Sequence, residues 1–79
     1  ALNSVFIQRR AKALLSLSEV QSADAGPDRI RAVYRRVYAR DPGEKEIELA
    51  VEYLADTDET SWITWVHALL AANEFHFVD

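Results

Sequence analysis

The stretch from Trp62 to Asp79, WITWVHALLAANEFHFVD, decides the fold of this chain. Its first part is an apolar helix with two tryptophans, and its second part is rich in aromatic residues. Asparagine tolerates the backbone geometry that ends helices, so we expect the helix to stop near Asn73. Phe75 and Phe77 then alternate with other residues, which predicts an extended tail docked on the helices. This stretch contains no evident reacting group, so it predicts an anchor of the structure.

The composition predicts one small all-α domain over residues 1–79. The chain has 79 residues, 49% of them apolar, with two glycines and two prolines. It has no cysteine, which excludes disulfides, thiolate metal sites and covalently attached haem. No apolar run approaches the roughly 18–20 residues of a membrane span. Because the sequence opens on Ala1 without a methionine, we expect a domain excised from a longer protein.

Apolar periodicity predicts four helices, packed as a small bundle. They span about residues 4–20, 27–39, 44–55 and 61–72, with Pro27 at the first position of its helix and Asp41-Pro42-Gly43 as a breaker. Asp58 or Thr60 is expected to cap the last helix. The predicted core consists of Ile7, Leu14, Ile30, Val33, Tyr34, Val37, Ile47, Val51, Leu54, Trp62, Trp65, Val66, Leu69 and Phe75.

Charge is distributed unevenly along a chain whose net charge is −4. Residues 1–40 carry eight basic and three acidic groups, while residues 41–79 carry one basic and ten acidic groups. We expect the two halves to pack against each other with opposite charges facing. The acidic side of this contact would be a stripe at helical spacing, formed by Glu44, Glu48 and Glu52. The basic side would be the flank formed by Arg29, Arg36 and Arg40.

Two surfaces are candidates for binding a partner. Leu49 and Tyr53 lie away from the predicted core face and form a second apolar edge, which together with Phe77 is a candidate protein-binding surface. The alternative is an anion- or nucleic-acid-binding site formed by the arginines in and just after the second predicted helix: Arg29, Arg31, Arg35, Arg36 and Arg40. Because the second half of the chain is acidic and would repel a polyanion, we do not expect nucleic acid as the partner.

Chemical sites are not expected in this chain. His67 and His76 do not have the spacing of metal ligands on one helix, and the acidic run that starts at Asp56 lacks the glycine and the final glutamate of a calcium loop. The serines have no neighbouring base to activate them, and no glycine-rich phosphate loop occurs. The sequence therefore predicts no catalytic residue, no metal and no cofactor, and we expect the chain not to be an enzyme.

Four segments, in this order, resemble the C-terminal region of a large bacterial family of unknown function. They are Leu2-Asn-Ser-Val-Phe6, Arg29-Ile-Arg-Ala-Val-Tyr34, Tyr38-Ala-Arg-Asp-Pro42 followed by Glu46-Ile-Glu-Leu-Ala50, and Ala68-Leu-Leu-Ala-Ala-Asn-Glu-Phe75 with Phe77-Val-Asp79. Members of this family are abundant in planctomycetes and are often associated with cytochrome c-like modules. The chain departs from the family pattern at Val5, Ala39, Asp41, Gly43 and Ala71-Ala72, which are positions of local structure.

The resemblance implies a module at the end of a large, usually exported protein, with the rest of that protein as its partner. It implies no catalytic residue in this region. The leading hypothesis is therefore a noncatalytic structural or interaction module. An exported or periplasmic location is suggested by the resemblance alone.

Overall fold

The structure is a computed structural model that describes residues 4–24, 26–55 and 58–77; for Ser4 and residues 74–77 it describes the backbone alone. These residues form five helices: α1 (Ser4–Leu15), α2 (Ser18–Gln21), α3 (Pro27–Tyr38), α4 (Glu44–Tyr53) and α5 (Glu59–Phe77). No strand occurs among them. The all-helical prediction is confirmed, with one helix more than expected.

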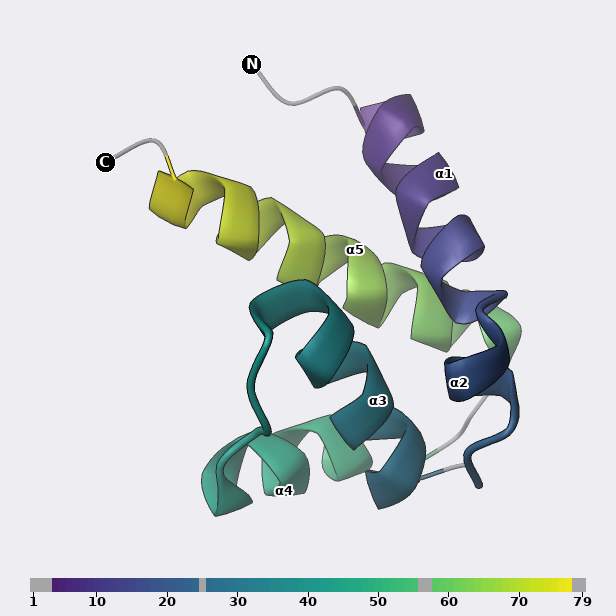
Figure 1. Ribbon diagram of the computed structural model, residues 1–79, viewed down its shortest axis with the longest axis vertical. Coiled ribbons are helices and arrows are strands. Elements are labelled where there is room, and N and C mark those ends of the chain that lie inside the picture. The colour runs from purple at the N-terminus through teal and green to yellow at the C-terminus, as the bar shows by residue number, and fades with distance from the viewer. Residues whose placement is uncertain (1–3, 25, 56–57, 78–79) are drawn as a thin grey trace.

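Three of the helices enclose the core. α1, α3 and α5 contact one another, and in Figure 1 α5 runs across the molecule between α1 and the α3–α4 pair. α2 packs on α1 and α3. Among the described helices, α4 contacts α3 alone. The predicted four-helix bundle is therefore not confirmed, since α4 adds the buried Ala50 to the core but contacts one helix instead of two neighbours.

The core contains most of the residues that periodicity assigns to it. Eight of the predicted members are buried: Ile7, Leu14, Ile30, Val33, Tyr34, Leu54, Trp62 and Val66. Val37, Trp65 and Leu69 are half-buried and pack against them. Two predictions on α4 are corrected, because Val51 is 40% exposed and Ile47 is half-buried. The side chain of Phe75 lies outside the described residues.

The first predicted helix, over residues 4–20, is broken into α1 and α2. Leu17 between them is extended, with φ −61° and ψ 140°. The Ser16 hydroxyl donates to the Lys12 carbonyl oxygen (2.9 Å), a local bond that competes with helix continuation. A straight helix would point Ser18 at the core. The bend leaves Ser18 exposed and buries Val20 instead, which is only 1% exposed.

Capping interactions fix where α3, α4 and α5 begin and end. Pro27 occupies the start of α3, and Ala39 ends it in left-handed geometry, with φ 58° and ψ 31°. The Gly43 N–H donates to the Glu46 carboxylate (2.8 Å), which closes half of a capping box at the start of α4. Asp58 accepts from the Ser61 N–H (2.8 Å) at the start of α5, which confirms one of the two predicted caps.

α5 is longer than the sequence indicates. The helix continues past Asn73 to Phe77, so the extended conformation predicted for the segment after Asn73 is wrong through Phe77. Asparagine is only a moderately poor helix former, and the alanines and leucines before it favour continuation. Val78 and Asp79 lie outside the described residues, as do the side chains that would dock the tail.

Candidate functional site

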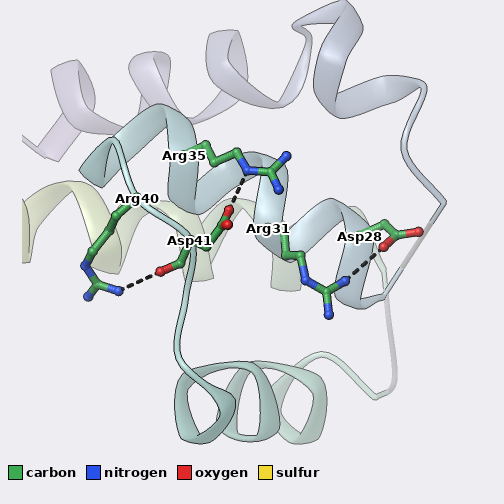
Figure 2. A network of polar contacts seen from close by, with 5 residues as sticks. All are labelled: Asp28, Arg31, Arg35, Arg40 and Asp41. Carbon is green, nitrogen blue, oxygen red and sulfur yellow. Dashed lines mark hydrogen bonds and ion pairs between the residues drawn. The ribbon is translucent and has the colours of Figure 1, made fainter.

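Three of the five candidate arginines pair with carboxylates of the same chain. Arg31 forms an ion pair with Asp28 (2.9 Å), and Arg35 donates from Nε to Asp41. Figure 2 shows both pairs along α3 and the loop that follows it, together with the bond from Arg40 to the Asp41 carbonyl oxygen (3.0 Å). These contacts neutralise much of the positive charge that an anion would need.

Arg40 makes the best-defined of these pairs. Its two terminal nitrogens contact the two carboxylate oxygens of Glu46 at 2.9 and 3.0 Å, the two-point geometry that arginine favours. The Arg40 guanidinium also lies over the rings of Tyr34 and Tyr38, 5.6 and 5.5 Å from their centroids. Arg40 is therefore committed to joining α3 to α4.

The remaining two candidate arginines lie elsewhere on the molecule. The Arg29 guanidinium lies 5.5 Å from the centroid of a Trp62 ring, and its Nη2 donates to the Ala23 carbonyl oxygen (3.3 Å). Arg36 lines a shallow pocket of about 280 Å³ between α1, α3 and α5. The structure thus does not bring the five arginines together into one anion-binding surface.

A row of aromatic side chains runs from Tyr38, beside Arg40, to Trp62, beside Arg29. Tyr38 and Tyr34 are 5.3 Å apart between ring centroids, Tyr34 and Trp65 are 6.0 Å apart, and Trp65 meets Trp62 edge to face at 5.7 Å. The Tyr38 hydroxyl donates to the Leu69 carbonyl oxygen (3.2 Å), which ties α3 to α5. These aromatic side chains pack against one another at the edge of the core, and they present no free reacting group.

The pKa shifts in this part of the molecule follow from burial and from the contacts of each group. The Arg40 guanidinium and the Gly43 N–H lower the pKa of Glu46 from 4.5 to about 2. Burial raises the pKa of the Tyr34 and Tyr38 hydroxyls. The Ser61 N–H lowers the pKa of Asp58. Each shift moves the pKa further from neutrality, so none of these groups is prepared for acid–base chemistry near neutral pH.

The predicted contact between the arginine flank and the acidic stripe is corrected by the structure. Arg40 pairs with Glu46 and not with the stripe. Arg31, which is not part of the predicted flank, lines a groove of about 550 Å³ with Glu44, Glu48 and Val51. Among the described residues no ion pair reaches Glu44, Glu48 or Glu52, and all three are exposed. The stripe faces outward because α4 presents a different side to α3.

The outer side of α4 is also apolar. Leu49 is 65% exposed and Tyr53 is 55% exposed, so both lie outside the core, as the sequence predicts. Val51 adds a third exposed apolar side chain on the same helix. The side chain of Phe77, the remaining member of the predicted surface, lies outside the described residues. We refer to Leu49, Tyr53, Glu44, Glu48 and Glu52 as the α4 face.

Metal sites and membrane spans are not found in the described part of the chain. It contains no group of three metal-ligating side chains, and none of its helices is long and apolar enough to cross a membrane. His67 is half-buried on α5, and the side chain of His76 is not among those described. The α4 face is thus the main candidate for a functional surface.

Comparisons with family models, curated proteins and solved structures found no match. The resemblance to the C-terminal region of the planctomycete-type family therefore stays a prediction.

Proposed function

We propose that this chain is a noncatalytic helical interaction module that binds another protein surface through the α4 face. The observation that carries the proposal is the exposure of Leu49 (65%) and Tyr53 (55%) on a helix that packs against α3 alone. Exposed large apolar side chains that cluster beside charged ones are typical of protein-binding surfaces. Aromatic residues such as Tyr53 are favoured at the centres of such surfaces.

The proposed partner is the rest of a larger exported protein to which this module belongs. The family resemblance supports this part of the proposal. Phe77, the third residue predicted for this surface, lies at the end of α5, which makes no contact with α4 among the described residues. The alternative, an anion- or nucleic-acid-binding site, has less support, because three of its five arginines already pair with carboxylates.

The proposal is tested by placing a photo-reactive side chain at position 49 of the natural polypeptide in the cells that make it. We expect a cross-link to another segment of that polypeptide or to a second protein, and we expect Tyr53→Ser to weaken it. Position 64 provides the control, because Thr64 is exposed on α5 away from the α4 face. Equal labelling at positions 49 and 64 would overturn the proposal.

The same surface makes a separate prediction about stability. Replacing Leu49 and Tyr53 together with serine should change the free energy of unfolding by less than about 0.5 kcal/mol per site, because surface substitutions have small effects. Leu54→Ala is the matched contrast: Leu54 is 3% exposed and should lose about 2–5 kcal/mol. Thermal denaturation measures both. A large fall for the serine variant would assign Leu49 and Tyr53 to the core.

A further inference from the structure

The pocket between α1, α3 and α5 has an apolar floor and a polar rim. Its described lining residues are Arg10, Ala13, Leu14, Leu17, Arg36, Val37, Leu70 and Asn73, around a space of about 280 Å³. Leu14 and Leu70 are buried, while Leu17 and Val37 are half-buried and pack against the core. The floor therefore consists of core residues at the junction of three helices. We refer to this space as the junction pocket.

The spacing of small and apolar residues explains why the junction pocket forms. Ala13 and Leu14 lie three and four residues after Arg10, so these three side chains share one side of α1. Leu70 and Asn73 are likewise three residues apart on α5. Ala13 is exposed and its side chain is a single methyl group, so it leaves space that a larger residue would fill.

Two polar side chains on the rim have no partner among the described residues. Arg36 is exposed, and its guanidinium makes neither an ion pair nor a hydrogen bond there. The side-chain amide of Asn73, which is half-buried, makes no hydrogen bond there either. Arg10 differs, because its guanidinium already lies over the Phe6 ring, 5.8 Å from the centroid. Arg36 and Asn73 are thus the groups that can receive a ligand.

These features define the chemistry of that ligand. The planar arginine fork matches the two oxygens of a carboxylate, and the asparagine amide can donate to one of them. None of the described lining residues is acidic, so nothing among them repels an anion. Inorganic phosphate or sulfate would leave the apolar floor uncovered, so the anion must carry an apolar group.

The size and the walls of the junction pocket favour a small molecule over a peptide. Its volume is near the lower end of the roughly 300–1,000 Å³ found for ligand pockets. The terminal carboxylate of a peptide is typically captured by free backbone N–H groups. Most of the lining residues lie inside α1, α3 and α5, where the helix itself uses those groups.

We infer that the junction pocket binds a small aliphatic monocarboxylate. The carboxylate lies against Arg36 and Asn73, and the aliphatic chain covers Leu14, Val37 and Leu70. The site shares no residue with the α4 face, so the inference goes beyond the proposed function and does not depend on it.

Amide NMR titration of the purified chain at neutral pH tests the inference, with hexanoate as the probe. Hexanoate should give saturable shifts at the backbone amides of Ala13, Val37 and Leu70. Hexanol and acetate should bind at least about fivefold more weakly, because hexanol lacks the carboxylate and acetate lacks the apolar chain.

Two variants locate the two halves of the ligand. Arg36→Gln should weaken hexanoate binding about fivefold, as expected for an exposed ion pair, and should leave hexanol binding unchanged. Arg9→Gln is the matched control, because Arg9 is exposed and does not line the junction pocket, so hexanoate binding should not change. Ala13→Leu keeps Arg36 but fills the space, so it should weaken hexanoate binding at least about fivefold. Far-UV circular dichroism checks that all three variants fold.

Several results would overturn the inference. One is equal affinity for hexanoate and hexanol, and another is an Arg36 variant that binds hexanoate as well as the Arg9 variant does. An Ala13 variant with unchanged affinity would also overturn it, because the ligand would then lie elsewhere. So would hexanoate shifts that are confined to α4, or no saturable shift with hexanoate at tens of millimolar.

Discussion

Glu46 joins the loop after α3 to the first turn of α4 through Arg40 and the Gly43 N–H. Folding lowers its pKa from 4.5 to about 2, so its contribution to stability is present above pH 4.5 and is lost as the pH falls toward 2. Glu46→Gln should therefore lower the free energy of unfolding by about 0.2–1 kcal/mol at pH 7, the range for an exposed ion pair, and by less near pH 2.

Urea unfolding of both proteins at several pH values measures this difference. Glu48→Gln is the matched control, since Glu48 belongs to the same helix and forms no ion pair within the described residues. A Glu46 variant whose deficit is the same at pH 7 and pH 2 would show that the carboxylate charge contributes nothing.

Tyr38 provides a second prediction for a single side chain. Its hydroxyl donates to the Leu69 carbonyl oxygen, so Tyr38→Phe removes a half-buried hydrogen bond between α3 and α5. The free energy of unfolding should fall by about 0.5–1.5 kcal/mol. Tyr53→Phe removes the same group from an exposed ring and should have almost no effect. Equal losses in the two variants would contradict the role assigned to the Leu69 bond.

Among the helices, α3 has a C-terminus that can be improved. Ala39 adopts φ 58°, a left-handed geometry that costs a residue with a Cβ roughly 1–2 kcal/mol. Ala39→Gly should therefore raise the free energy of unfolding by up to about 1 kcal/mol, after the greater freedom of glycine in the unfolded chain is subtracted.

The same substitution at an ordinary helical position should have the opposite sign. Ala72 is exposed within α5, where glycine costs about 0.5–1 kcal/mol. Chemical denaturation of the two variants gives the comparison. A loss of stability in both would show that the left-handed geometry of Ala39 carries no strain.

Periodicity predicts the existence of the helices better than their ends. It identifies α3 and α4 closely, because proline, glycine and the Glu46 cap mark their boundaries. The break at Leu17 carries no such signal, since the residues on both sides of it fit a helix. Val51 is exposed because α4 packs against α3 alone. The sequence of α4 by itself does not show how many neighbours the helix will have.

For the molecule as a whole, α1 packs on α5 and shares its core, so loss of α1 packing should destabilise the entire fold. Ile7 is 2% exposed, and Ile7→Ala should lose about 2–5 kcal/mol out of the roughly 4–12 kcal/mol expected for a chain of this size. Far-UV and near-UV circular dichroism should show coincident transitions. Helix loss that precedes the tryptophan signal would show that α1 unfolds by itself.

The relation between the two halves of the chain was predicted only in outline. They do pack together, with Trp62 buried and Trp65 half-buried. The charges, however, meet through the Arg35–Asp41 and Arg40–Glu46 pairs, while the acidic stripe faces outward. A helix wheel shows which residues share a side, but it does not show which neighbour that side meets. The exposed α4 surface was predictable because Leu49 and Tyr53 lie off the core arc.

The tight grouping of Trp62, Trp65 and Tyr34 gives this chain a built-in optical reporter. Tyrosine emission should pass to the neighbouring indoles by energy transfer in the folded state, so fluorescence excited at the tyrosines should come mainly from tryptophan. Unfolding would separate the rings, shift the indole emission to longer wavelength and restore the tyrosine band. The state of the core can thus be followed without attaching a dye.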